Sequence, residues 1–178
     1  FSGELAFEMY IESDYAHGMM DLLWESTQQF DGCLYGLEAL GALRVEKGHV
    51  TGAELDGRVT IDDAGLGKMA STKKSYIGSA MRKRGALSEE DREMLVGFFP
   101  INNKETFNAG TIVCEQNNIK GQGIGRITSV THSPELGHWI GIGFVKGGFH
   151  KWKDVTLDGA DPVRNKQIEI KIVSPHML

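Results

Sequence analysis

The sequence predicts an α+β fold, in which a partial α/β domain is followed by a small antiparallel β-barrel. The first half of the chain carries apolar residues at helical spacing, as at Leu37, Leu40 and Leu43. The second half instead contains short apolar runs separated by turn residues, which is typical of small barrels and sandwiches. We therefore divide the chain into an α/β domain over 1–88 and a barrel domain over 89–178.

The composition is that of a globular protein, with 40% hydrophobic and 24% charged residues among 178. A formal net charge of -5 gives no general attraction to nucleic acid. No apolar run is long enough to span a bilayer, and no signal-peptide pattern is present. We therefore expect a cytoplasmic protein without nucleic-acid or membrane partners.

The two cysteines and the first residue carry further expectations. Cys33 and Cys114 stand apart, without a C-x-x-C pair. They fit buried thiols in a reducing cytosol, and a single disulfide is the alternative. The chain begins at Phe1 rather than at a methionine, so we interpret it as a fragment of a longer protein.

The N-terminal part is expected to form a strand and then a helix. Apolar and polar residues alternate over 3–11, which predicts a half-buried strand. Ser13 and Asp14 follow and can cap a helix that runs to about residue 29.

A second helix is expected from Tyr35, with its leucines facing a core and Gly48 ending it. Glu46 lies at the exit of this helix. A carboxylate fixed there can accept two hydrogen bonds from one flat pair of donors, as in the recognition of a pterin or purine edge. The alternative is a solvated helix end.

A cluster of basic residues lies near the end of the first half. A short basic helix is expected over 79–84, after a pair of lysines. Such runs are usually solvated faces, and the alternative is an anion site for a carboxylate or a polyglutamate tail. The cluster consists of Lys73, Lys74, Arg82, Lys83 and Arg84.

The barrel half is predicted to contain several short strands. The glycines of GQGIGR fit neither dinucleotide nor P-loop spacing, so they predict a hairpin turn. Gly141 and Gly143 leave one face of a strand without side chains, so a helix or a ligand is expected to pack there. The strands are expected over 95–99, 111–115, 125–130, 139–145 and 167–173.

The SPELGHW stretch offers only weak signals for chemistry. His132 and His138 lack a third ligand at zinc spacing, and Ser133 lacks a G-x-S-x-G context. Pro134 is expected to start a turn and a short helix. We therefore assign no metal ligands.

Several separated blocks resemble the folate-binding aminomethyltransferase family, whose best-known member is the T-protein of the glycine cleavage system. The resemblance covers nearly the whole chain. The wording EKGH, GHWIG and DPVR is similar to the alpha subunit of heterotetrameric sarcosine oxidase, with dimethylglycine or related methylamine oxidases close behind. The blocks are SGELAFEMY, GLEALGALRVEKGH, DDAGLGKM, KKSYIG, GRITSVTHSPELGHWIGIGF and DPVR.

This resemblance implies a folate-binding region with three site residues. Glu46 matches the family glutamate that holds the pterin of tetrahydrofolate. Lys73 and Lys74 fall at the family's basic position near the folate carboxylates. The family's catalytic aspartate lies upstream of these residues, so no catalytic residue is assigned.

The resemblance also implies an oxidoreductase complex in one-carbon metabolism. Sarcosine, tetrahydrofolate and O2 would give glycine, 5,10-methylenetetrahydrofolate and H2O2. FAD, FMN and NAD would bind to other parts of a complex with beta, gamma and delta subunits, so we expect this fragment to be inactive alone. The alternatives are a T-protein-like aminomethyltransferase and a non-catalytic assembly module of the same fold.

Overall fold

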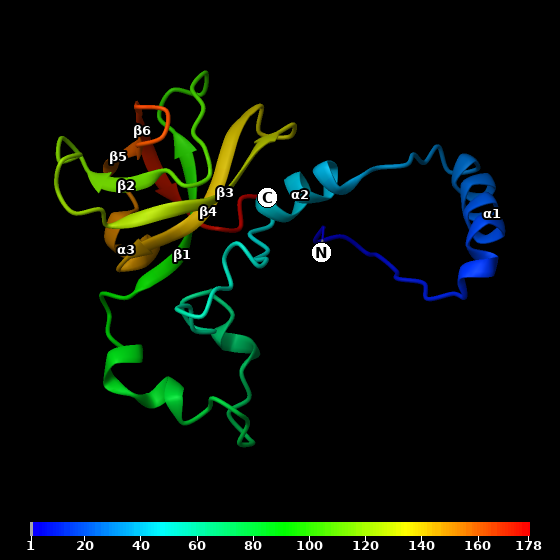
Figure 1. Ribbon diagram of the computed structural model, residues 1–178, viewed down its shortest axis with the longest axis horizontal. Coiled ribbons are helices and arrows are strands. Elements are labelled where there is room, and N and C mark those ends of the chain that lie inside the picture. Colours follow the sequence, from blue (N-terminus) through cyan, green and yellow to red (C-terminus); the bar gives the residue numbers. More distant parts are fainter. Residues whose placement is uncertain (1) are drawn as a thin grey trace.

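A computed structural model describes residues 2–178 (Figure 1). The second half forms a closed barrel in the order β1-β4-β3-β2-β5-β6, and every pair of neighbouring strands is antiparallel. The predicted antiparallel barrel is therefore confirmed. Its strands are β1 (Glu93–Pro100), β2 (Ile112–Glu115), β3 (Gly125–Ser133), β4 (His138–Lys146), β5 (Thr156–Asp161) and β6 (Lys166–Val173).

Each strand expected in the barrel half overlaps an observed strand, but β5 was not predicted. Its sequence TLDGAD lacks the alternation that marks a strand. Its buried Asp158 instead accepts a hydrogen bond from the backbone N–H of Asn117 at 2.8 Å. Gly121 and Gly123 of GQGIGR lie in the loop between the paired strands β2 and β3, and Gly125 begins β3, as the hairpin prediction requires. A short helix that was not predicted, α3 (Gly148–Trp152), follows β4.

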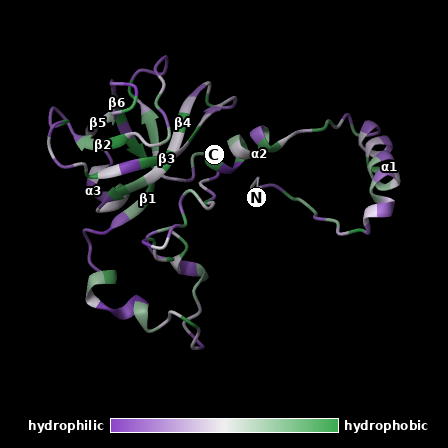
Figure 2. Cartoon of the chain, in the orientation of Figure 1, coloured by the Kyte–Doolittle hydropathy of each residue, from purple (hydrophilic) through white to green (hydrophobic). Residues whose placement is uncertain are grey.

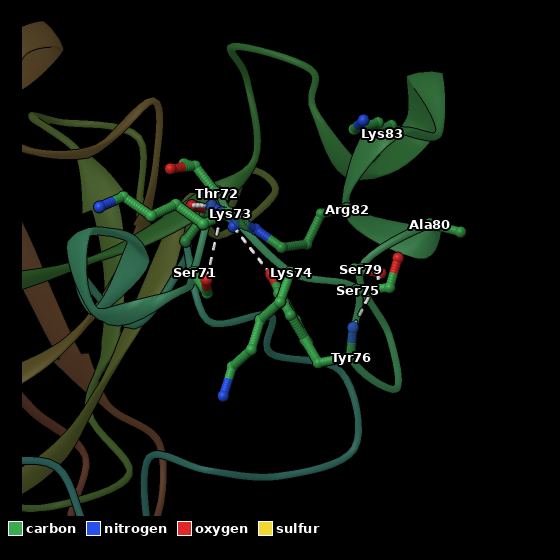
Figure 3. A pocket seen from close by; sticks show the side chains of 11 residues that line it. Ser71, Thr72, Lys73, Lys74, Ser75, Tyr76, Ser79, Ala80, Arg82 and Lys83 are labelled. Atoms are coloured by element: carbon green, nitrogen blue, oxygen red, sulfur yellow. Dashed lines mark hydrogen bonds and ion pairs between the residues drawn. The ribbon is translucent and has the colours of Figure 1, made fainter.

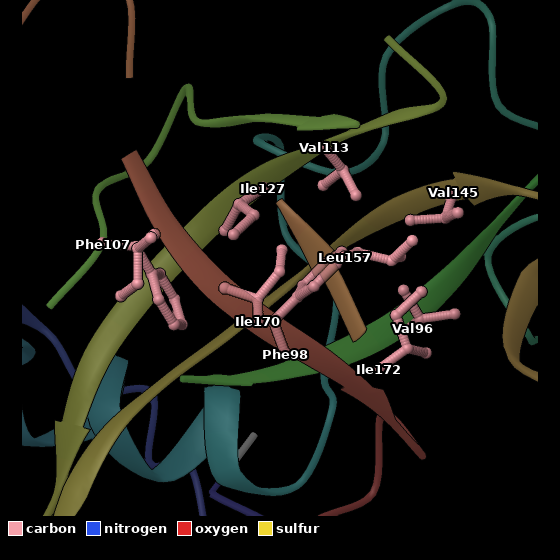
Figure 4. Packing of buried hydrophobic residues seen from close by; sticks show 10 residues of the cluster. Val96, Phe98, Phe107, Val113, Ile127, Val145, Leu157, Ile170 and Ile172 are labelled. Atoms are coloured by element: carbon pink, nitrogen blue, oxygen red, sulfur yellow. The ribbon is translucent and has the colours of Figure 1, made fainter. Parts of the chain in front are cut away.

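The barrel interior is filled by aliphatic and phenyl side chains that point inward from all six strands (Figure 4). Close packing of this kind leaves no channel through the barrel and makes the fold rigid. A second cluster joins the outside of the barrel to the preceding helix; it contains Val45, Leu95, Ile140, Ile142 and Phe144. The interior cluster contains Val96, Phe98, Phe107, Val113, Ile127, Val145, Leu157, Ile168, Ile170 and Ile172.

The space beside the two glycines of β4 is occupied by the barrel itself. A Cβ atom on Gly141 would lie 2.7 Å from Cε2 of Phe107, and one on Gly143 would lie 2.1 Å from the carbonyl oxygen of Arg126. The expectation of a helix or a ligand at this position was therefore wrong. The glycines are needed because β3 and Phe107 approach the β4 backbone closely.

The second predicted helix is α2 (Leu37–Glu46), and it ends as expected. Gly48 adopts a φ of 69°, which favours glycine. Its N–H donates to the carbonyl of Val45 at 3.1 Å, and the N–H of His49 donates to the carbonyl of Arg44 at 2.8 Å. This pair of bonds is a Schellman motif, which fixes the direction of the chain after Glu46.

The buried face of α2 differs from the expectation. Leu37 is 86% exposed, whereas Val45 and Glu46 at the other end are buried. Only the C-terminal turns of α2 pack against the barrel, beside β3 and β4 (Figure 1). Burial therefore follows proximity to the barrel rather than the leucine pattern.

The predicted strand over 3–11 was wrong, because this segment is extended but unpaired. Among residues 2–178 no strand lies beside it to complete its hydrogen bonds, and Phe7 is 84% exposed. The following helix α1 (Ala16–Gln28) has no buried residue and projects away from the barrel (Figures 1 and 2). Ser13 and Asp14 lie in a 3-10 turn, η1 (Ser13–Tyr15), and make no side-chain cap.

The segment that joins α2 to the barrel contains turns and short 3-10 helices. The expected basic helix over 79–84 is reduced to η3, and Pro134 lies in a turn without a helix. No helix within residues 2–178 has both the length and the apolarity needed to cross a membrane. The 3-10 helices are η2 (Gly67–Met69), η3 (Met81–Lys83) and η4 (Gly85–Leu87).

The cysteine prediction holds for one thiol. Cys114 is buried in the barrel, but Cys33 is exposed in the loop between α1 and α2. Both are free thiols. Burial raises the pKa of the Cys114 thiol, and the nearby carboxylate of Asp158 raises it further.

Candidate functional site

Glu46 is a buried carboxylate at the junction of α2 and the barrel. Its side chain is only 4% exposed because the last turn of α2 packs against the second apolar cluster. The hydroxyl of Ser133, at the end of β3, donates a hydrogen bond of 2.5 Å to its Oε1. Ser133 is fully buried and lies 87 residues away in the sequence. The bond therefore fixes the helix end to the barrel.

The second oxygen of this carboxylate is differently placed. Among residues 2–178, no donor forms a hydrogen bond with Oε2 of Glu46. The carboxylate as a whole is nearly excluded from solvent. Glu46 thus combines one anchored oxygen with one that receives no hydrogen bond from residues 2–178.

The C-terminal segment crosses the same helix end. The N–H of Met177 donates to the carbonyl oxygen of Glu46 at 2.9 Å, and Nδ1 of His176 lies 2.9 Å from the carbonyl oxygen of Lys47. A Cβ atom on Gly48 would lie 2.5 Å from the carbonyl oxygen of Pro175. The backbone around Glu46 is therefore held by the chain terminus as well as by the Schellman motif.

A second buried glutamate, Glu54, lies near this helix end and was missed by the sequence reasoning. It is 0% exposed, and its Oε1 accepts hydrogen bonds from the hydroxyls of Thr128 and Ser129 at 2.7 and 2.6 Å. Its Oε2 accepts from Arg44 at 3.1 Å and from the backbone N–H of Thr51 at 2.8 Å. The T-x-x-E spacing of a capping box was the signal that could have revealed it.

These donors determine the ionisation of Glu54. Burial alone would raise the pKa of its carboxyl group. The hydrogen bonds from Ser129, Thr128 and Thr51, together with the charge of Arg44, outweigh burial and lower the pKa below its ordinary value of 4.5. Glu54 is therefore a saturated anion that joins α2 to β3.

Lys73 and Lys74 lie in a separate place, on an open hollow of about 780 Å³ (Figure 3). Both lysine side chains are exposed, and Figure 3 shows them extending to the opposite side from Lys83. Arg82 also lines the hollow, but its guanidinium donates to Asp62 at 2.6 Å and to the hydroxyl of Tyr76 at 3.0 Å. The unshared positive charge of this basic hollow therefore comes mainly from the lysines.

The structure does not bring the three predicted site residues together. Glu46 does not line the basic hollow. The segment that carries Lys73 and Lys74 lies below the barrel in Figure 1, away from α2. Within residues 2–178 the carboxylate and the lysines thus form two separate features.

A different hollow, of about 760 Å³, runs along α2 as far as Val45, the residue before Glu46, and Glu46 itself does not line it. Its walls include Ala42 and Val45 of the helix and Trp139 of β4. His132 packs edge-on against Trp139, with ring centroids 5.9 Å apart. Small and aromatic side chains therefore line the groove beside the helix that ends in Glu46.

The two histidines near Ser133 are engaged by neighbouring groups. Nδ1 of His138 lies 2.8 Å from the carbonyl oxygen of Trp139, and His132 contacts the Trp139 ring. Across residues 2–178, no three His, Cys, Asp or Glu side chains are placed to hold a metal ion. The hydroxyl of Ser133 is directed to Glu46 instead.

Two family models match the chain and together cover most of it. The GCVT N-terminal domain matches residues 1–74, and the glycine cleavage T-protein C-terminal barrel domain matches residues 94–178.

Curated relatives fall into two groups. The sarcosine oxidase subunit alpha of Rhizobium meliloti (strain 1021) is 36% identical over 164 residues, which is 88% of this chain and 16% of that protein. An aminomethyltransferase of Bacteroides thetaiotaomicron is 30% identical over 179 residues, which is 98% of this chain and 47% of that protein. The chain therefore spans less than half the length of these relatives.

A solved structure has the same fold. The crystal structure of glycine cleavage system aminomethyltransferase T from Bartonella henselae superimposes with a TM-score of 0.69 at 20% sequence identity. The match covers 90% of this chain and 44% of that one.

Proposed function

The chain belongs to the glycine cleavage T-protein family, and from this premise we propose that it is the folate-binding part of a sarcosine oxidase alpha subunit. The observation that carries the proposal is Glu46, a buried carboxylate with one anchored oxygen and one that receives no hydrogen bond from residues 2–178. A rigid acceptor of this kind suits the flat donor edge of a pterin.

In this proposal Glu46 binds the pterin of tetrahydrofolate. The carboxylate accepts hydrogen bonds from an amino group and a ring N–H, and such charge-assisted bonds contribute about 1.5–3 kcal/mol each. The groove along α2 supports this role, because its small side chains and Trp139 provide an apolar surface for a flat ring.

Lys73 and Lys74 are proposed to contact the carboxylates of the folate tail. Their exposed ammonium groups line the basic hollow, and few neighbouring acidic groups neutralise their positive charge. Exposed lysines attract anions without fixing their geometry. The lysines would therefore strengthen binding, while Glu46 provides orientation.

The proposed reaction belongs to the whole complex. Sarcosine is oxidised and its methyl carbon passes to tetrahydrofolate, which gives glycine, 5,10-methylenetetrahydrofolate and, with O2 as oxidant, H2O2. FAD, FMN and NAD are assigned to other parts of a cytoplasmic complex with beta, gamma and delta subunits. The boundary between domains 1–88 and 89–178 is part of the proposal, and the start of β1 at Glu93 supports it.

The proposal is tested by titrating the full-length protein with tetrahydrofolate and following tryptophan fluorescence. We expect saturable binding, and we expect Glu46→Ala to raise Kd at least tenfold. The matched control is Glu25→Ala, because Glu25 is an exposed glutamate in α1 and does not line the groove along α2. Its Kd should stay within about twofold of the original, as for most exposed substitutions.

Two results would contradict parts of this proposal. Equal binding by the original protein and Glu46→Ala would remove Glu46 from the site. Absence of binding by the original protein would exclude the folate function and support a non-catalytic assembly module.

A T-protein-like aminomethyltransferase is the second candidate function. It is favoured by the aminomethyltransferase of Bacteroides thetaiotaomicron, which matches nearly the whole chain. Such an enzyme requires no flavin, whereas sarcosine oxidation does. The absorption spectrum of the purified full-length complex separates the two, since bound flavin is expected only for the oxidase.

A further inference from the structure

Ser133 is held in a fixed orientation by the turn that joins β3 and β4. Its Oγ accepts a hydrogen bond from the N–H of Leu136 at 3.1 Å, and its carbonyl oxygen accepts one from the N–H of Gly137 at 2.9 Å. The residue is 0% exposed. Water therefore does not compete for the hydroxyl group.

The hydroxyl has a single proton, and the structure determines where it points. A serine hydroxyl offers one donor and two acceptor positions. The Leu136 N–H occupies an acceptor position, and the Oγ atom lies 2.5 Å from Oε1 of Glu46. The proton is thus directed to the Glu46 carboxylate. The turn that holds Ser133 therefore sets the direction from which this carboxylate receives its hydrogen bond.

We infer that Ser133 is a positioning residue, which aims the other oxygen of Glu46 at the ligand. This inference rests on the proposed function of Glu46. A glutamate side chain has several rotatable bonds, and a hydrogen bond to one oxygen fixes the plane of its carboxylate. Ser133 itself does not contact the ligand in this arrangement.

A neighbouring serine provides an internal comparison. Ser129 lies on the same strand and donates to Oε1 of Glu54 at 2.6 Å. Glu54, however, is saturated by further donors, which include Arg44 and Thr128. The Ser129 bond therefore completes a closed network, whereas the Ser133 bond leaves an acceptor available.

The test compares serine variants of the full-length protein by tetrahydrofolate titration and by melting temperature. We expect Ser133→Ala to raise Kd about tenfold, the order expected for a hydrogen bond to a charged group. Ser133→Thr keeps the hydroxyl and should stay within about threefold of the original Kd. The control Ser129→Ala should lower the melting temperature while Kd stays within about twofold.

A double-mutant cycle separates positioning from general stability. If Ser133 acts through Glu46, adding Ser133→Ala to Glu46→Ala should cause no further loss of affinity. If Ser133 only stabilises the fold, its replacement should weaken binding in both backgrounds, and Ser129→Ala should weaken binding as well. That second pattern would overturn the inference.

The remaining outcomes are also decisive. Should Ser133→Ala fail to fold, Ser133→Cys replaces it, because a thiol has similar size but is a weak donor; an unchanged Kd in that variant refutes positioning. Loss of binding in Glu46→Ala with normal binding in Ser133→Ala overturns this inference alone. Absence of binding in the original protein overturns the proposed function and the inference together.

Discussion

The guanidinium of Arg44 contacts the fully buried carboxylate of Glu54 at 3.1 Å and also donates to the hydroxyl of Ser129 at 2.7 Å. One side chain of α2 thus reaches both the following loop and β3. Arg44 lies in the last turn of α2, so this network joins the end of the helix to the following loop and to the barrel.

Removing Glu54 should destabilise the protein strongly. Glu54→Ala leaves Arg44 with a largely buried, uncompensated charge, and breaking a buried ion pair in this way costs about 3–5 kcal/mol. Denaturant unfolding of the full-length protein measures this loss. The control is Asp91→Ala, which removes an exposed partner of Lys151 and should change stability little. Equal effects of the two substitutions would refute the role given to the network.

Acidification should also destabilise the protein. For Asp63, burial alone would raise the pKa, but hydrogen bonds from Arg92 and Thr60 outweigh it and lower the pKa below 3.8. The pKa of Glu54 is likewise lowered from 4.5. As the pH falls through the ordinary pKa values of 4.5 and 3.8, these two carboxyl groups bind protons in the unfolded chain before they do so in the folded one. The free energy of unfolding therefore falls with pH.

This pH dependence can be measured through the denaturation midpoint between pH 7 and pH 3. The contribution of these two groups to the midpoint should change little down to about pH 5. It should then decline with further acidification. In Glu54→Gln the decline should be shallower, because one of the two carboxylates no longer titrates. A decline of the same steepness in that variant would exclude Glu54 as a contributor.

The lysines of the basic hollow should contribute to affinity in a salt-dependent manner. Replacing both Lys73 and Lys74 by alanine should raise the Kd for tetrahydrofolate by about fivefold at low salt, and less at high salt because exposed charges are screened. The control replaces Lys104 and Lys120, which are exposed on barrel loops. A salt-independent effect, or an equal effect of the control, would contradict the assignment.

Two glycine substitutions should have opposite effects on stability. Gly143→Ala would place a Cβ atom against the backbone of β3 and should lower the melting temperature, because neither strand can move without disturbing the barrel. Gly41→Ala lies within α2 with open space around it, and it should stabilise the helix by about 1 kcal/mol. Differential scanning calorimetry distinguishes them, and destabilisation by both would mean that the groove along α2 needs a glycine.

The sequence predicted the barrel better than it predicted the N-terminal half. Strands such as β6 alternate apolar and polar residues because one face lies against the barrel core. The same alternation over 3–11 was misleading, since a strand also needs a neighbouring strand, and none lies beside this segment within residues 2–178. The strand β5 was missed for the opposite reason. Its Asp158 is buried and accepts a hydrogen bond from a residue distant in the sequence, which no local sequence pattern predicts.

The candidate site could be predicted only in part. The sequence indicated Glu46 as a helix-end carboxylate, and the Schellman turn at Gly48 confirms that position. Its contact with Ser133 could not be predicted, because the pair is 87 residues apart and depends on how α2 docks against the barrel. Glu54 was overlooked although its spacing from Thr51 is that of a capping box.

Closure of the barrel has a consequence for how this domain meets other chains. In the order β1-β4-β3-β2-β5-β6, β1 pairs with both β4 and β6, so each strand of the barrel has a neighbour on either side. The barrel, as described within residues 2–178, therefore offers a partner no free edge where it could add a strand. Contacts with this domain must be made through side chains and loops, and these are the parts of a protein that evolve most freely.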